Sequence, residues 1–187
     1  MNNLEDRILL GSGSSRNVYL HNNYALKESK NLIGIIQNET EVFLKTNYNC
    51  SLLNNIQRYS TNYERIIVDK ANILTIENTK EIFNCEIKDI LIYWELHSHR
   101  LKDNLYEMNK LLFHNKLLSD YIFNNTCENK NLLKIYQSFS KLIKTIPELR
   151  PFDLKKLSSW GIVNNNLKLI DFGITENNIK IIKLLKK

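Results

Sequence analysis

Residues 11–18 read Gly11-Ser12-Gly13-Ser14-Ser15-Arg16-Asn17-Val18 and lie between two runs of strand-forming residues, 7–10 and 18–20. Small residues in such a loop let backbone N–H groups approach an anion closely. A glycine-serine turn is also common in plain hairpins, so the loop alone leaves both interpretations open. The residues that follow it favour an anion-binding loop.

A third expected strand, 24–27, follows a turn at Asn22-Asn23, because Asn tolerates a positive φ. Alternation along this strand places Ala25 and Lys27 on one face, beneath the glycine loop. A lysine in that position can reach the phosphates of a ligand. Two more strands are expected at 56–59 and 64–68.

From residue 31 to 46 the apolar period becomes that of a helix. The apolar stripe comprises Leu32, Ile35, Ile36 and Phe43. Glu39 falls in phase with this stripe, whereas Glu41 joins the polar side. Because an inward-facing carboxylate needs a cation, the pattern predicts an ion pair between Glu39 and Lys27. The alternative is that Glu39 lies at the edge of the stripe, in water.

Near the end of the chain, two short strands at 161–163 and 167–170 flank a turn of three Asn residues. Asp153 precedes this hairpin and Asp171 follows it, so the two carboxylates can converge on one cleft. Asp171 suits Mg²⁺, a hard cation that prefers oxygen ligands, and Asp153 suits the acceptance of a proton from a hydroxyl. Either Asp alone is more often a turn residue or a helix cap.

Between these ends the helical period dominates, for example from Leu132 to Ile146. A sheet-rich first third and a helix-rich remainder predict an α+β fold of two lobes with a cleft between them. The expected boundary divides one domain into residues 1–71 and 72–187. We expect the basic tail from Ile179 to Lys187 to be a short amphipathic helix that closes the second lobe.

Composition sets broad limits on the function. The 187 residues are 43% hydrophobic and 25% charged, which is typical of a globular protein. No run is apolar enough to span a bilayer, so we expect no membrane span and a cytoplasmic location. Cys50, Cys85 and Cys127 are widely spaced and suggest reduced thiols rather than disulfides or zinc ligands. The net charge of +6 would suit an anionic partner, but Lys is spread along the chain and nucleic acid ranks last.

These motifs, in this order, resemble the protein-kinase-like superfamily, and most closely its short bacterial or phage-type Ser/Thr kinase-like proteins, in which Arg commonly replaces the third glycine, as Arg16 does here. The resemblance runs from Leu10 to Gly173. It implies a kinase-like fold, with an antiparallel β N-lobe and a reduced, mainly helical C-lobe, and it implies ATP and Mg²⁺ as cofactors.

By this resemblance, the nucleotide would be held by Gly11, Ser12, Gly13, Ser14, Val18, Ala25, Lys27, Glu39, Val68, Asp69 and Ala71. Val68 would be the gatekeeper, and the residues from Asp69 to Ala71 would offer backbone groups to adenine. Asp153 would be the catalytic base, and Lys155 would steady the transferred phosphoryl group. Asp171 would be the main magnesium ligand.

The sequence departs from the family pattern at two places. Pro151-Phe152 replaces the His-Arg that precedes the catalytic Asp, and Ser158 stands where a second metal ligand, Asn, is expected; with a one-residue insertion the counterpart is Ser159. The leading hypothesis is a minimal Ser/Thr protein kinase. The alternatives are a pseudokinase that acts as a binding module and a kinase of small-molecule hydroxyls, which gains weight because few residues after Gly173 remain to hold a peptide.

Overall fold

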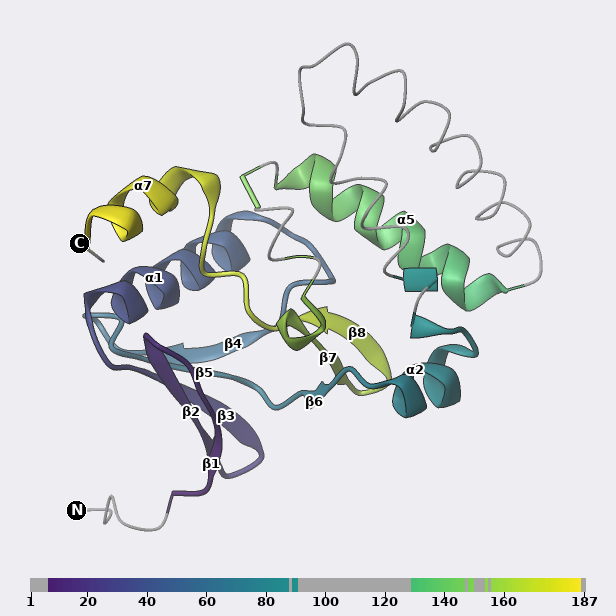
Figure 1. Ribbon diagram of the computed structural model, residues 1–187, viewed down its shortest axis with the longest axis horizontal. Coiled ribbons are helices and arrows are strands. Elements are labelled where there is room, and N and C mark those ends of the chain that lie inside the picture. Colours follow the sequence, from purple (N-terminus) through teal and green to yellow (C-terminus); the bar gives the residue numbers. More distant parts are fainter. Residues whose placement is uncertain are drawn as a thin grey trace.

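The computed structural model describes residues 7–87, 89–90, 129–146, 148–149, 154 and 156–185 (Figure 1). The described elements, in chain order, are β1 (Leu9–Ser12), β2 (Arg16–His21), β3 (Tyr24–Ser29), α1 (Leu32–Asn47), β4 (Ile56–Tyr59), β5 (Arg65–Asp69), β6 (Asn72–Ile73), α2 (Ile76–Phe83), α5 (Lys130–Thr145), the 3₁₀ turn Leu157–Ser159, β7 (Trp160–Val163), β8 (Asn166–Leu169) and α7 (Glu176–Leu185).

The first five strands form an antiparallel sheet in the order β1-β2-β3-β5-β4. The predicted turn at Asn22 is confirmed, since this residue has a φ of 53°. Strand β5 lies between β3 and β4, and its Ile66 and Val68 are buried against α1 residue Val42 and β3 residue Ala25. The sheet therefore has a small apolar core of its own.

Helix α1 begins at its N-cap, Asn31, whose side chain accepts a hydrogen bond from the Gly34 N–H. The helix packs against β3, and Figure 1 shows it lying alongside the first sheet. Its buried residues are Gly34, Gln37, Asn38, Glu41, Val42 and Leu44. The predicted inward stripe is wrong: Leu32 and Phe43 are each 54% exposed.

The inward face of α1 carries polar side chains, and these form hydrogen bonds with neighbouring segments. Asn38 donates to the carbonyl groups of Tyr63 and Glu64. Gln37 accepts a hydrogen bond from the Ser15 hydroxyl, at 2.6 Å. Satisfied polar groups tolerate burial, so the apolar stripe does not decide which way this helix faces.

The second sheet has the order β6-β7-β8 and lies beside α2 and α5 (Figure 1). The predicted Asn turn is confirmed, with Asn164 and Asn165 at φ 48° and 60°. Phe139 of α5 packs edge-on against Trp160 of β7, with ring centroids 4.7 Å apart. Both residues are fully buried and lie in the larger of the two apolar clusters.

The two sheets are joined close to their edges. Leu53, just before β4, forms a parallel bridge with Leu169 of β8. The Leu169 N–H donates to the Leu52 carbonyl at 2.7 Å, and the Asn54 N–H donates to the Leu169 carbonyl at 3.1 Å. The larger cluster also includes Leu44 and Cys50, so it draws on residues from both sides of the predicted boundary at residue 71. That boundary stays a prediction.

Helix α7 links the second part of the chain to α1. The Glu176 N–H at its start donates to the Glu148 carbonyl, and its Asn178 amide donates to the Thr40 hydroxyl of α1 at 2.9 Å. The tail was expected to be a short helix that closes the second lobe; the helix is observed, and it also contacts α1. The contact brings the segment after Gly173 directly against α1.

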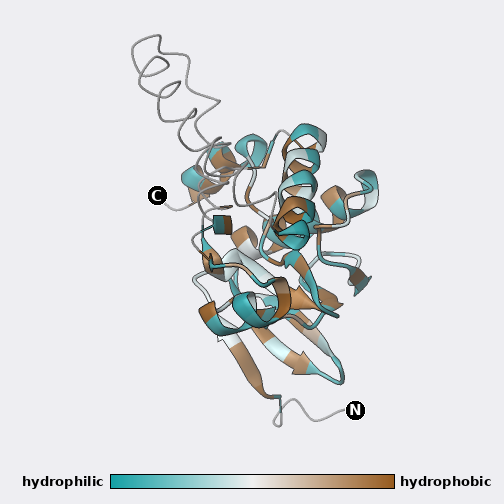
Figure 2. Cartoon of the chain, turned by 90° about the vertical axis from the view of Figure 1, so that its right-hand side faces the viewer, coloured by the Kyte–Doolittle hydropathy of each residue, from teal (hydrophilic) through white to brown (hydrophobic). Residues whose placement is uncertain are grey.

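The predicted α+β class is confirmed, with an antiparallel sheet at the amino-terminal end followed by helices. Figure 2 shows hydrophobic and hydrophilic residues alternating along the helices. Within the described ranges, no helix is both long and apolar enough to cross a bilayer. Cys50 and Cys85 are buried free thiols, as expected, and Cys127 lies outside the described residues.

Candidate functional site

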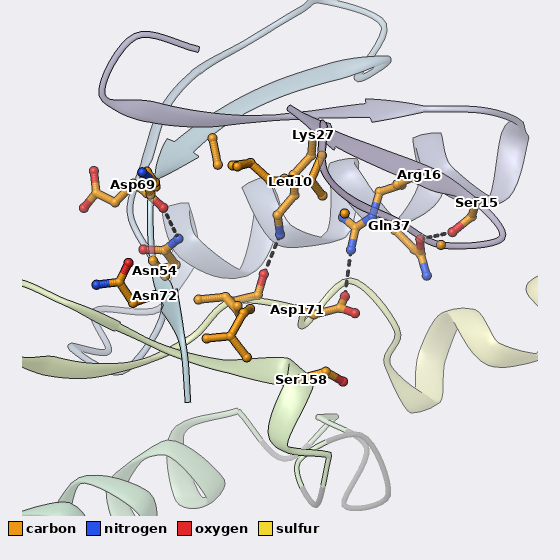
Figure 3. A pocket seen from close by; sticks show the side chains of 18 of the residues that line it. Leu10, Ser15, Arg16, Lys27, Gln37, Asn54, Asp69, Asn72, Ser158 and Asp171 are labelled. Atoms are coloured by element: carbon orange, nitrogen blue, oxygen red, sulfur yellow. Dashed lines mark hydrogen bonds and ion pairs between the residues drawn. The ribbon is translucent and has the colours of Figure 1, made fainter. Parts of the chain in front are cut away.

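A cavity of about 670 Å³ lies between the two sheets (Figure 3). Its roof is the glycine loop and the sheet residues Val18, Ala25 and Lys27. Its floor includes Ile170 and Asp171, which directly follow β8. The cavity thus collects residues from both ends of the sequence, as the order of the motifs predicts.

Lys27 is 6% exposed, and its ammonium group donates to the Glu41 carboxylate and to the Ile170 carbonyl, each at 2.5 Å. The expected partner, Glu39, is exposed on the far side of α1. The prediction of a Lys27–Glu39 pair is therefore wrong by half a helical turn. Glu41 takes this role because the helix turns its polar face, not its apolar stripe, toward the sheet.

Arg16 forms the second buried cation of the site. Its Nη1 donates to Glu41 at 2.8 Å and to Asn38 at 3.1 Å, and its Nη2 donates to Asp171 at 2.7 Å. Figure 3 shows Lys27 and Arg16 extending from the sheet toward the segment that carries Asp171. Two cations and two carboxylates therefore form one connected network.

The two cations respond differently to burial. Burial lowers the pKa of Lys27 below its ordinary value; Glu41 opposes this change and Arg16 adds to it. Burial also acts against the charge of Arg16, but Glu41 and Asp171 together outweigh it and raise the pKa of the guanidinium. Arg16 is consequently the more firmly charged member of the pair.

The segment Asp171-Phe172-Gly173 packs directly onto α1. The Phe172 ring is buried in the larger apolar cluster, 6.0 Å from the Lys27 ammonium group. A Cβ on Gly173 would lie 2.6 Å from the Gln37 carbonyl oxygen, so only glycine fits this approach. Asn178 also donates to the Gly173 carbonyl at 3.0 Å. These contacts fix the position of Asp171 relative to α1.

The glycine loop is also fastened to α1. Asn31 donates to the Ser14 carbonyl, and a Cβ on Gly34 would lie 2.2 Å from the Ser15 carbonyl oxygen. Lys30 donates to the Ser12 hydroxyl at 2.7 Å and to the Gly13 carbonyl at 2.8 Å. This role of Lys30 was not predicted. Among the predicted loop residues, Gly11, Gly13 and Ser14 line the cavity.

Of the three apolar residues expected at the nucleotide, Val18 and Ala25 line the cavity, whereas Val68 does not. Val68 is 3% exposed, packs in the apolar cluster with Val42 and Ile66, and is not among the residues that line the cavity. Asp69 and Ala71 do line the cavity. The Asp69 carbonyl accepts a hydrogen bond from the buried Asn54 side chain, which fixes this edge of the site.

The two serines considered for the second metal position lie in different surroundings. Ser158 is exposed on the cavity wall. Ser159 is 2% exposed, and its carbonyl accepts hydrogen bonds from the N–H groups of Ile170 and Asp171. Ser159 thus holds the backbone of Asp171, and of these two serines it is Ser158 that lines the cavity. Asp153 and Lys155 lie outside the described residues.

The described residues of the cavity suit a metal ion that is held through one carboxylate, that of Asp171. The Asp171 side chain is 56% exposed and faces the cavity, and one of its oxygens is bound by Arg16. Across the described ranges, His, Cys, Asp and Glu nowhere gather in a group of three or more that would hold a metal ion. A magnesium ion here would therefore depend on Asp171 and on oxygens supplied by the nucleotide and water.

Arg16, Asn38 and Glu41 were not predicted to be partners in one network. A signal for the latter two was present in the spacing of Gly34, Gln37, Asn38 and Glu41, which recurs every three or four residues and so marks one helix face. A glycine in such a row indicates a close backbone approach.

Comparisons with known proteins find similarity in structure. No family model and no curated protein matches the chain. Among solved structures, the chain is similar to APH(2")-IIa in its ternary complex with streptomycin and ATP, with a TM-score of 0.40 and 19% sequence identity. The match covers 90% of this chain and 65% of that one, so this chain spans about two thirds of the length of the protein it matches.

Proposed function

We propose that this protein binds ATP with a divalent cation and transfers its terminal phosphoryl group to a hydroxyl. The observation that carries the proposal is the buried Lys27 ammonium, held by Glu41 and the Ile170 carbonyl at the wall of a cavity that also presents the glycine loop and Asp171. A fixed cation beside a loop of backbone N–H groups is suited to a polyphosphate.

Each residue has a distinct role in this proposal. Lys27 would bind phosphate oxygens, and Glu41 would hold the ammonium in position. Asp171 would bind the magnesium ion, which neutralises charge on the phosphates and helps to align them. The apolar surface formed by Val18, Ala25 and Ile170 would cover the adenine. Asp153 would accept the proton of the attacking hydroxyl, and Lys155 would stabilise the transferred group.

For the acceptor, we favour a small-molecule hydroxyl over a Ser or Thr of a protein. Only two residues separate Gly173 from α7, and that helix packs against α1. An extended peptide is recognised through a surface that runs along its backbone. The short, anchored connection after Gly173 offers little surface of that kind next to the site, which supports a compact acceptor.

A second candidate is a pseudokinase that binds nucleotide without transferring phosphate. It is favoured by the Arg16–Asp171 ion pair, which engages the expected metal ligand at 2.7 Å. The two candidates differ in turnover, because a pseudokinase would bind ATP but form no ADP with any acceptor.

The test is a thermal-shift titration with ATP and Mg²⁺, followed by ADP release in the presence of a panel of small hydroxyl compounds and protein acceptors. Ligand at a hundred times its dissociation constant stabilises the fold by about 2.7 kcal/mol, or roughly 5–11 °C for a chain of this size. Lys27→Ala should abolish the shift, whereas Lys80→Ala, whose side chain is 72% exposed on α2, should preserve it. No shift for the folded wild-type protein would overturn the proposal; a shift without ADP release from any acceptor would favour the pseudokinase.

A further inference from the structure

Arg16 connects β2 to α1 and to the segment that follows β8. The residue is 8% exposed, lines the cavity and contacts three side chains from two distant parts of the chain. Its two terminal nitrogens serve different partners. Nη1 is held on α1 by Asn38 and Glu41, whereas Nη2 reaches across to Asp171.

The two contacts also differ in exposure. Glu41 is fully buried, so the Nη1 end is anchored in the protein interior. Asp171 is 56% exposed at its side chain, so the Nη2 end lies where a ligand in the cavity can compete for it. The guanidinium is thus fixed at one end and available for exchange at the other.

Charge gives a reason for such an exchange. Without a ligand, Lys27 and Arg16 balance Glu41 and Asp171. A polyphosphate that enters the cavity adds several negative charges next to the Asp171 carboxylate, and this repulsion must be offset by a cation. Arg16 is the cation already in contact with Asp171, and its guanidinium can donate to a phosphate oxygen as well as to a carboxylate.

We propose that Arg16 is a phosphate ligand and the resident cation of the Asp171 site. On nucleotide binding its Nη2 passes from Asp171 to a phosphate oxygen, while Nη1 remains on Asn38 and Glu41. The nucleotide then binds in the absence of a metal ion, and the released carboxylate is free to take up Mg²⁺ afterwards. This inference rests on the proposed nucleotide site, and it adds the side chain of Arg16 to the groups that bind phosphate.

The geometry requires arginine rather than lysine. A guanidinium presents several N–H groups in a planar fork, so it can keep two anchors on α1 and still donate to a third group. A lysine ammonium is a compact charge on a flexible stem and is less able to bridge partners on opposite sides of the cavity.

The experiment is isothermal titration of ATP into wild type, Arg16→Gln and Arg16→Lys, each in EDTA and in excess Mg²⁺. The readout is the ratio of the dissociation constants, EDTA over Mg²⁺. We expect wild type to bind ATP in EDTA with a ratio below about tenfold. Arg16→Gln should weaken binding in EDTA by roughly tenfold to a hundredfold, the range for one charge-assisted hydrogen bond, and by less in Mg²⁺, so its ratio rises.

Arg16→Lys keeps the charge and serves if Arg16→Gln does not fold, as judged by thermal melting; its ratio should also exceed that of wild type, by a smaller factor. A ratio unchanged in either folded variant would overturn the inference and leave the nucleotide site intact. Failure of wild type to bind ATP under both conditions would overturn the proposed function and this inference with it.

Discussion

Replacement of Glu41 by Gln tests the central ion network of the site. Glu41 is fully buried and is the shared partner of Lys27 and Arg16. Removal of one partner from a buried charge pair costs about 3–5 kcal/mol. We expect the lower value, about 3 kcal/mol, because Lys27 retains the Ile170 carbonyl and Arg16 retains Asp171. That loss is a large part of the roughly 5–15 kcal/mol by which a domain is stable.

The assay is thermal unfolding followed by circular dichroism, supported by urea denaturation. A loss of about 3 kcal/mol lowers the melting temperature by roughly 6–12 °C for a chain of this length. Glu39→Gln, two residues earlier on the exposed face of α1, is the matched control and should change the free energy of unfolding by no more than about 0.5 kcal/mol. Equal destabilisation by the two substitutions, or a larger effect from Glu39→Gln, would refute the assignment of Glu41.

Three further predictions concern packing and thiol chemistry. Gly173→Ala should destabilise the fold by about 1–3 kcal/mol, because the new Cβ would lie 2.6 Å from the Gln37 carbonyl oxygen. Gly11→Ala is the control: its Cβ would have no atom within 4 Å, so thermal unfolding should match that of wild type. Phe139→Ala should cost about 3–5 kcal/mol in urea denaturation, against a small change for Leu133→Ala on the exposed side of α5; similar costs would contradict the assigned helix face. Burial and two neighbouring carboxylates raise the pKa of Cys85 to about 11. Alkylation of Cys85 at pH 8, followed by mass spectrometry of its peptide, should therefore be roughly a hundredfold slower in the folded protein than in urea-unfolded protein. Equal rates would contradict the burial of this thiol.

Local rules were sufficient for the elements whose residues interact mainly with sequence neighbours. The Asn22 and Asn164 turns follow from the tolerance of Asn for a positive φ, and both are observed. Strand β4 has the predicted bounds, whereas β1 begins two residues later than predicted, at Leu9. The glycine loop, Lys27 and Asp171 also converge on one cavity, as their order in the sequence indicates.

The position of Val68 depends on tertiary packing and was not predictable from its own strand. This residue faces the same side of the sheet as its cross-strand partner Ala25, which lines the cavity, but it packs with Ile66 and with Val42 of α1 and is not a lining residue. A strand pattern gives the alternation of faces but not which part of a face a neighbouring helix covers. The same limit applies to α7, whose partner on α1 lies far away in the sequence.

The orientation of α1 shows why the Glu39 assignment failed. The apolar-stripe rule assumes that the buried face of a helix is its most apolar face. This holds when polar side chains have no hydrogen-bond or charge partners in the protein interior. Here the inner face carries Gln37, Asn38 and Glu41, and those partners are supplied by Ser15, Arg16 and Lys27 from two strands and a loop. None of these contacts is local, so no periodicity in the helix can report them. A helix that serves a charged site is therefore best oriented by the cations it must meet, and the presence of both Lys27 and Arg16 at one end of the sheet favours the face that carries Glu41.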